Sequence, residues 1–193
     1  MKIYFQDLAI ESDSEVYAPA EDSFLLANAL EIRSGDSVLD IGTGSGIIAL
    51  TAAKKASNVL GVDLNPRAVK LAERNAVLNG LGNVVFKESD LFSSVSGRFD
   101  VIAFNPPYLP VSEDGLLERS WSGGVVGIDI LLRFISQVRG FLREDGRVYM
   151  VASSLNPLDE IRDALSQSGL SFSIVAEEKV PFETLYVILS MKL

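Results

Sequence analysis

The alternation of apolar, strand-like runs with helix-like segments is the feature of this 193-residue chain that most constrains its fold. Strand and helix alternate about every 25 residues, which is typical of βαβ units and of a doubly wound parallel sheet. We expect strands at residues 37–42, 58–64, 83–88, 99–105 and 146–153. We expect helices at residues 20–32, 47–56, 66–80, 127–144 and 157–169.

The C-terminal end of the chain departs from this alternation. LSFSIVAEEKV and ETLYVILSMKL read as two consecutive strands around Pro181, with no helix between them. Two strands joined by so short a connection must run antiparallel. We therefore expect an α/β sheet that is parallel except for one reversed strand near its C-terminal end, which an ordinary nicotinamide-binding sheet does not require.

Composition excludes several kinds of chemistry. The chain has no cysteine and no histidine, so disulfides, thiolate metal sites and Ser-His-Asp triads are impossible, and we expect no metal site. The net charge is −9, from 17 Lys and Arg against 26 Asp and Glu, and we see no basic stripe. We therefore do not expect direct nucleic-acid binding, unless a partner supplies the positive charge. Any reaction must use carboxylates, amides, hydroxyls or a cofactor.

Length and hydropathy indicate one globular unit. With 48% hydrophobic residues, the chain can form one sizeable core. We expect a single domain over residues 1–193, with an N-terminal segment and helix at 1–33 and the core at 34–193. No apolar run reaches the roughly 18 residues of a membrane span, and the N-terminus lacks the apolar region of a signal peptide. We expect a cytoplasmic protein without a membrane partner.

Polar residues stand at the ends of four successive predicted strands. They are Asp40, Asp63, Asp90 and Asn105. The carboxyl ends of parallel strands meet at one edge of the sheet, where such folds bind their ligands. Taken alone, Asp63 can be an acid beside a helix start and Asp90 a helix N-cap. Together, the four positions predict a single ligand crevice.

The residues around these strand ends suit a nucleoside. Gly42, Gly44 and Gly46 follow Asp40, and glycines there let the backbone approach a ligand closely, although a tight strand-to-helix turn explains them equally well. Their spacing is G-x-G-x-G, not the dinucleotide G-x-G-x-x-G. Asp63 lies 23 residues after Asp40, where a carboxylate can accept both hydroxyls of a ribose. Asp90 with the following leucine can bind an adenine amino group and pack against its ring.

The stretches VLDIGTGSG, GVDLNPRAV, SDLF and NPPY, in this order, resemble the class I S-adenosylmethionine-dependent methyltransferases. The resemblance implies that family's Rossmann-like sheet of seven strands, including the reversed one, and S-adenosyl-L-methionine as the cofactor. It implies that Asp40 lies near the amino end of the cofactor, Asp63 on the ribose, and Asp90 with Leu91 at the adenine.

The NPPY motif, residues 105–108, fits transfer of a methyl group to a planar amino group. An amide nitrogen is a weak nucleophile, and fixed acceptors on its two N–H groups can turn it toward the methyl group. Asn105 offers a side-chain carbonyl and Pro106 a backbone carbonyl, the prolines stiffen the loop, and Tyr108 offers a flat face. We call residues 105–108 the amide claw. The alternative is that Pro106 and Pro107 form a rigid exit from a buried strand.

Three further stretches, VYAPAEDSFLL, WSGGVVGIDI and PFETLYVI, resemble the HemK-related release-factor glutamine methyltransferases of the archaeal and eukaryotic type. Position by position, this resemblance implies cofactor contacts for Ser23, Asp40, Gly42, Gly44, Asp63, Asp90, Leu91 and Asn105. It implies that the glutamine is held by Asn105, Pro106, Pro107, Tyr108 and Leu109, with Asn105, Pro106 and Tyr108 as the catalytic residues. Ser23 can instead be an ordinary first-turn helix residue, and Trp121 can line the rim of the acceptor pocket or only anchor its loop.

The implied substrate is the glutamine in the Gly-Gly-Gln loop of a class I translation release factor, and a small zinc-binding activator subunit is an implied partner. Three alternatives stay open. The same motif serves methyltransferases acting on adenine N6 or guanine N2 of nucleic acids. The substrate can also be a small molecule or a lysine-type protein target. Last, the chain can be a binding module without catalysis, which its intact set of strand-end residues argues against.

Overall fold

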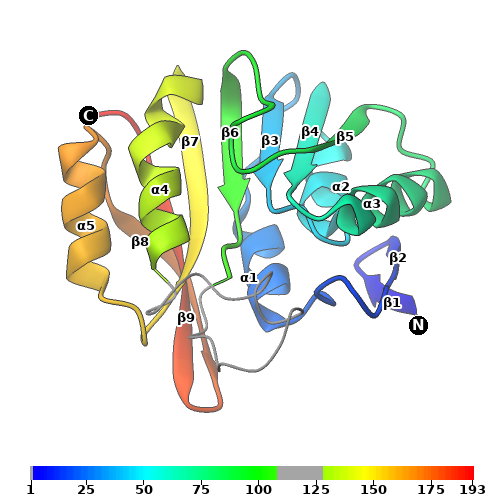
Figure 1. The fold of residues 1–193 in the computed structure, drawn as a ribbon, viewed down its shortest axis with the longest axis horizontal. Helices are drawn as coiled ribbons and strands as arrows, with labels where there is room; N and C mark the ends of the chain where they lie inside the picture. The colour runs from blue at the N-terminus through cyan, green and yellow to red at the C-terminus, as the bar shows by residue number, and fades with distance from the viewer. Residues whose placement is uncertain (1, 108–127) are drawn as a thin grey trace.

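A seven-stranded sheet forms the centre of the computed structural model, which describes residues 2–107 and 128–193 (Figure 1). The strand order is β5-β4-β3-β6-β7-β9-β8. The strands are β3 (Ser37–Ile41), β4 (Asn58–Asp63), β5 (Val84–Glu88), β6 (Phe99–Phe104), β7 (Leu142–Ser153), β8 (Ser173–Val180) and β9 (Glu183–Ser190).

Only one strand of this sheet, as far as the chain is described, runs against the others. β3, β4, β5, β6 and β7 pair parallel to one another, whereas β9 pairs antiparallel with both β7 and β8. This confirms the predicted α/β sheet with one reversed strand. The two C-terminal strands are joined by two residues, and so short a connection permits only an antiparallel pair.

Helices cover both faces of the sheet. One face packs against α1 (Glu21–Ala29), α2 (Ile47–Ala53) and α3 (Pro66–Leu78), and the other against α4 (Asp129–Val138) and α5 (Leu158–Gln167). Strand β6 shows why the central strands are apolar throughout: Val101 and Ala103 belong to the first core and Ile102 and Phe104 to the second. In the ranges that the structure describes, no helix is long and apolar enough to cross a membrane.

The predicted helix 127–144 is too long. Helix α4 ends at Val138, a 3-10 turn follows over Arg139–Phe141, and β7 already begins at Leu142. The buried Leu142 side chain packs beneath Gly146, where an added Cβ would lie 2.6 Å from Leu142 Cδ1. The spacing of apolar residues gives no sign of this contact within the strand. The predicted helix therefore extends beyond the observed end of α4. The other predicted elements end within a few residues of their observed bounds.

An N-terminal hairpin was not predicted. It consists of β1 (Lys2–Phe5) and β2 (Leu8–Glu11), and it packs on α3. The amides of Asn75 in α3 and of Asn79, which caps its C-terminus, each exchange two hydrogen bonds with the β2 backbone, at Glu11 and Ala9 respectively, over 2.8–3.1 Å. The two asparagines therefore hold the hairpin against the helix.

Candidate active site

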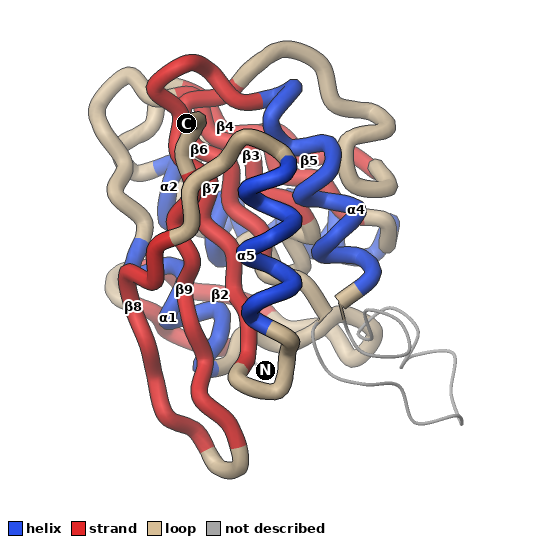
Figure 2. Tube along the Cα trace, turned by 90° about the vertical axis from the view of Figure 1, so that its left-hand side faces the viewer, coloured by secondary structure: helices blue, strands red, loops and turns tan. Residues whose placement is uncertain are grey.

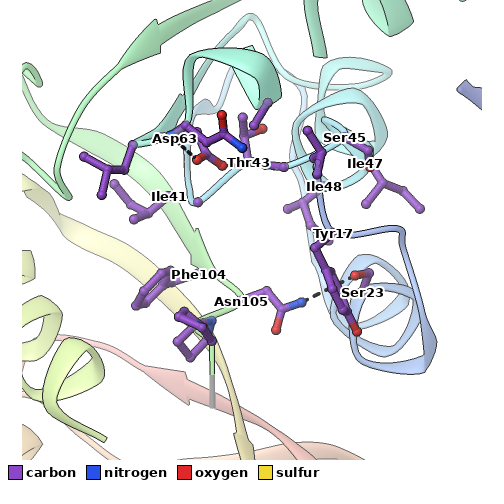
Figure 3. Close-up of a pocket in the computed structure, with 18 of the residues that line it drawn as sticks. Tyr17, Ser23, Ile41, Thr43, Ser45, Ile47, Ile48, Asp63, Phe104 and Asn105 are labelled. Carbon is purple, nitrogen blue, oxygen red and sulfur yellow. Dashed lines mark hydrogen bonds between the residues drawn. The ribbon is translucent and has the colours of Figure 1, made fainter. Parts of the chain in front are cut away.

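A pocket of about 410 Å³ lies at the carboxyl ends of β3, β4 and β6 (Figure 3). This volume is within the usual range for small-molecule sites. Its walls come from the segment before α1, the loop after β3, the ends of β4 and β6, and the start of α4. Of the predicted site residues, it is lined by Ser23, Gly42, Gly44, Asp63, Asp90, Leu91, Asn105, Pro106 and Pro107.

The glycine loop after β3 has a backbone that only glycine adopts readily. Gly42, Gly44 and Gly46 have φ values of +65°, +54° and +88°. Gly46 also starts α2, and a Cβ added there would lie 3.0 Å from the Ala72 Cβ of α3. The loop can therefore approach a ligand closely while α2 packs tightly against α3.

Asp40 lies beneath this loop, not on the pocket wall where the sequence had placed it. Its side chain is buried, and Oδ2 accepts hydrogen bonds from Thr43 Oγ1 at 2.7 Å and from the Ala49 N–H at 3.2 Å. Burial raises the pKa of Asp40 to about 7. Gly42, two residues after Asp40, does line the pocket. Asp40 therefore supports the pocket wall through its hydrogen bonds to the loop and to the start of α2.

Asp63 ends β4 and connects the two loops around it. Its Oδ2 accepts from the Gly44 N–H at 2.9 Å and its Oδ1 from the Asn65 N–H at 2.8 Å. Burial raises the pKa of Asp63. Each carboxylate oxygen has a second lone pair, so Asp63 can still accept ligand hydroxyls. The Asn65 side chain in turn donates to the Glu15 carbonyl at 2.9 Å, which fixes the segment before α1 beside the pocket.

The rim beyond β5 is formed by Asp90 and Leu91. Asp90 Oδ2 pairs with Arg133 Nη2 of α4 at 3.0 Å, with both side chains about half exposed. Leu91 is buried and has a left-handed backbone, with φ of +49°. The ion pair joins the end of β5 to α4 across one side of the pocket. Arg133 was not predicted, because nothing in its local pattern relates it to a residue 43 positions earlier.

Asn105, directly after β6, is held in one orientation. Its Nδ2 donates to Asp22 Oδ2 at 3.1 Å and to Ser23 Oγ at 3.4 Å. Figure 3 shows its nitrogen directed toward Tyr17 and Ser23 and its oxygen away from them. That oxygen, Oδ1, is buried and has no hydrogen-bond partner within the described ranges. A buried acceptor without a donor is costly, so a ligand N–H that reached this oxygen would bind favourably.

Asp22 and Tyr17 are site residues that the sequence reasoning missed, because Asp22 also reads as an ordinary acid in the first turn of a helix. Asp22 is only 3% exposed and accepts hydrogen bonds from Asn105, from the Tyr17 hydroxyl at 3.2 Å and from the Ser23 N–H at 2.6 Å. Burial, with the nearby Asp22 carboxylate, raises the pKa of Tyr17. The VYAPAED stretch was the available signal, since it contains both residues.

Tyr108, Leu109 and Trp121 lie outside the described residues, so their predicted places in the claw and at the rim stay predictions. Pro106 and Pro107 are described and line the pocket next to Asn105. The structure thus brings together the described part of the claw, the glycine loop and the strand-end acids Asp63 and Asp90.

Comparison with known proteins identifies relatives of this chain. The profile of the methyltransferase small domain matches residues 8–179. A Methanocaldococcus jannaschii protein, named provisionally as a protein N5-glutamine methyltransferase, is 46% identical over 199 aligned positions that cover 100% of each chain. Methyltransferase HEMK2 of Homo sapiens is 30% identical, over 91% of this chain and 89% of its own.

Among solved structures, the Mtq2–Trm112 complex of E. cuniculi, which is described as responsible for methylation of the eRF1 translation termination factor, aligns with a TM-score of 0.76 and 28% identity. The alignment covers 93% of this chain and 99% of that chain. The chain belongs to the methyltransferase small domain family and, within it, to the HemK-related methyltransferases. It is an S-adenosylmethionine-dependent methyltransferase, which confirms the predicted enzyme class and cofactor.

The pocket fits this cofactor. It is large enough for a nucleoside with an amino-acid tail, its glycine loop permits close approach, and Asp63 has lone pairs left for ribose hydroxyls. The pocket walls are mixed: apolar Ile41 and Leu91 lie among polar Thr43 and Asp90. Both an apolar ring and a polar tail can therefore find partners.

Proposed function

We propose that this protein transfers the methyl group of S-adenosylmethionine to the side-chain amide nitrogen of the glutamine in the Gly-Gly-Gln loop of a class I translation release factor. The observation that carries the proposal is Asn105: its nitrogen is fixed by Asp22, and its buried oxygen lacks a donor in the described structure. The N–H of a substrate amide is such a donor. The names of the relatives, HEMK2, Mtq2 and protein N5-glutamine methyltransferase, support the same substrate class.

The cofactor would be held by residues around the whole pocket. In this proposal Gly42 and Gly44 face its methionine end, Asp63 accepts from its ribose, and Asp90 with Leu91 holds its adenine. Ser23 and Asn105 contact it near the reacting centre, while Asp40 acts only through the loop. When bound, S-adenosylmethionine supplies an electrophilic methyl group on a positively charged sulfur.

The chain's own residues would make the amide reactive. Asn105 Oδ1 and the Pro106 carbonyl accept the two N–H groups of the glutamine, which turns the nitrogen lone pair toward the methyl group. The new bond would form at this nitrogen as the bond from sulfur to the methyl carbon breaks, and one N–H proton would pass to water. Pro107 stiffens the loop, and Tyr108 with Leu109 would cover the planar amide. A histidine base is not needed.

The negative charge of the enzyme favours a protein loop over a nucleic acid as the substrate. The net charge of −9 repels a phosphate backbone, whereas a release-factor loop needs no basic groove. Translation termination takes place in the cytoplasm, so the proposal also places the protein there.

We further propose that a small zinc-binding activator protein covers the edge of the sheet at β5. This strand stands at one edge of the described sheet, and its Val85 is 58% exposed. Val77 of the neighbouring α3 is 82% exposed. Exposed apolar residues beside an unpaired strand edge are typical of surfaces that a partner covers. The Mtq2–Trm112 complex is the comparison that supports a small partner.

An acceptor panel tests the proposed function. The enzyme is incubated with radiolabelled S-adenosylmethionine and, separately, with the release factor, its Gln-to-Ala loop variant, tRNA, rRNA and DNA, each with and without the activator. Label on the wild-type factor that is absent from its loop variant is the expected result. Label on a nucleic acid instead would refute the glutamine proposal and favour a base as the acceptor.

A further inference from the structure

The β8–β9 hairpin projects beyond the rest of the sheet on the pocket side. Ser153, the last residue of β7, pairs with Leu185 of β9, but the hairpin continues to the pair Val180–Glu183. Figures 1 and 2 show the two strands extending past the ends of the others, on the side where α1 lies. Within the described part of the chain, the end of the hairpin therefore has no neighbouring strand.

The sheet register gives the size of this overhang. Phe104, the last residue of β6, pairs with Met150, and Met150 pairs with Ile188. Phe182, in the turn of the hairpin, lies six positions before Ile188. At about 3.3 Å per residue, the tip reaches roughly 20 Å past the level of Phe104, the residue before Asn105. A small acceptor bound in the pocket would not extend so far, whereas a folded protein would.

Phe182 at this tip has an unusual conformation and no packing. Its side chain is 100% exposed, and its φ of +74° lies in the left-handed region that disfavours a residue with a Cβ. An aromatic ring in such a position contributes nothing to the core. Strained residues and exposed aromatic side chains are both enriched at binding surfaces.

The base of the hairpin is held firmly beside the pocket. Glu183 accepts a hydrogen bond from the buried Ser153 hydroxyl. Thr184 exchanges two bonds with Ser154, from its N–H to Oγ at 2.9 Å and from the Ser154 N–H to its carbonyl at 2.8 Å. These bonds fix the direction in which the tip projects, so little ordering is needed when a partner binds.

The space between the hairpin base and the pocket is negatively charged. Besides burial, the carboxylates of Asp22, Glu21 and Glu183 all raise the pKa of Tyr17, whose side chain lines the pocket. β8 adds two exposed carboxylates, Glu177 and Glu178, against one exposed cation, Lys179. A partner surface that carries basic side chains would complement this rim.

We propose that the tip of the β8–β9 hairpin, with Phe182 at its apex, is a second contact for the folded release factor. The factor would place its acceptor loop in the pocket and present an apolar depression flanked by basic residues to the tip. This inference rests on the proposed function and extends it, because it adds a contact outside the acceptor pocket.

Steady-state kinetics with two substrates test the inference. The substrates are the folded release factor and a short synthetic peptide that carries its Gly-Gly-Gln loop. The variants are Phe182→Ala and, as a matched control, Tyr4→Ala, which removes a 75% exposed aromatic side chain from β1. We expect Phe182→Ala to raise KM for the folded factor about tenfold with kcat retained. The ratio of kcat/KM for the folded factor to kcat/KM for the peptide should therefore fall about tenfold.

Three results of these measurements would overturn the proposed hairpin contact. Unchanged KM for the factor in Phe182→Ala would overturn the inference, and so would an equal loss on factor and peptide, which would indicate a structural role. An effect of Tyr4→Ala as large as that of Phe182→Ala would also overturn it. If the wild-type enzyme methylates neither factor nor peptide, the proposed function fails and the inference falls with it.

Discussion

The Asn105 amide nitrogen donates a hydrogen bond to the buried Asp22 carboxylate at 3.1 Å, across 83 residues of sequence. A carboxylate only accepts, so this bond determines which end of the amide faces Asp22. The Asn105 oxygen is consequently directed away from α1, and in the proposed function it accepts a hydrogen bond from the substrate amide. Asp22 is thus a positioning residue for the claw.

Asp22→Asn tests this role. An amide at this position can donate as well as accept, so Asn105 would no longer be held in one orientation. We expect kcat to fall about 100-fold, as for a misplaced reactive group, while the fold is retained. Asp159→Asn is the matched control, because Asp159 is an exposed acid in the first turn of α5. Equal losses in both variants would indicate a helix-dipole effect and contradict the positioning role.

Asn105→Ala removes the proposed acceptor for the substrate amide. We expect methyl transfer to fall about 1,000-fold, because a fixed polar group at the reacting centre is lost, and cofactor affinity to fall only modestly. Single-turnover transfer and calorimetric titration of S-adenosylmethionine measure the two quantities separately. Asn58→Ala, at the exposed start of β4, should change neither. Activity of Asn105→Ala equal to that of the wild type would refute the claw.

Asp63→Ala should weaken cofactor binding. It removes the carboxylate that we propose accepts from the ribose hydroxyls, and it leaves the N–H groups of Gly44 and Asn65 without their partner. We expect the Kd for S-adenosylmethionine to rise about 10- to 100-fold. Asp145→Ala, which changes an exposed acid near the start of β7, should leave Kd unaltered. Unchanged affinity in Asp63→Ala would show that the cofactor does not use this carboxylate.

The raised pKa of Asp40 predicts a pH-dependent contribution to stability. The ordinary value is 3.8 and the folded value about 7, so between these two pH values the folded chain binds the proton more tightly than the unfolded chain. This contribution therefore favours folding at low pH and is lost as the pH rises toward 7, with a slope of at most about 1.4 kcal/mol per pH unit.

Asp40→Asn removes this titration. Its unfolding free energy, measured in urea, should rise relative to that of the wild type between pH 5 and pH 7 and then stay level. The comparison with the wild type cancels the many other acids of the chain. A difference between the two proteins that is constant over this pH range would contradict the raised pKa.

The strain at Phe182 predicts a gain in stability when it is relieved. Glycine adopts the left-handed backbone readily, so Phe182→Gly should raise the unfolding free energy above that of Phe182→Ala by about 1 kcal/mol, equivalent to roughly 2–4 °C in Tm. Both variants lose the same exposed ring, so their comparison isolates the backbone. Equal melting temperatures would show that the turn is not strained.

The features that the sequence predicted well are those decided locally. The reversed strand follows from the short turn at Pro181, and the crevice follows from the polar residues Asp63, Asp90 and Asn105, because parallel strands must end at the same edge. The start of β7 was missed because it depends on the packing of Leu142 beneath Gly146.

Contacts between distant segments could not be read from the pattern. Asp22 meets Asn105 only because α1 folds over the end of β6, and a first-turn acid gives no sign of such a contact. Asp40 was placed on the pocket wall because it ends a strand, but its side chain points beneath the loop, toward Thr43 and Ala49. A residue's position at the end of a strand predicts which part of the molecule it lies in. The contacts of its side chain depend on the conformation of the loop that follows.

The most direct test of the account is to locate the transferred methyl group by fragment mass spectrometry of the release factor after reaction with the enzyme and S-adenosylmethionine. We expect one added methyl group on the side-chain amide of the Gly-Gly-Gln glutamine, formed about 1,000-fold more slowly when Asn105→Ala replaces the wild-type enzyme. A methyl group on any other residue, or the same rate of modification with Asn105→Ala, would contradict the proposed function.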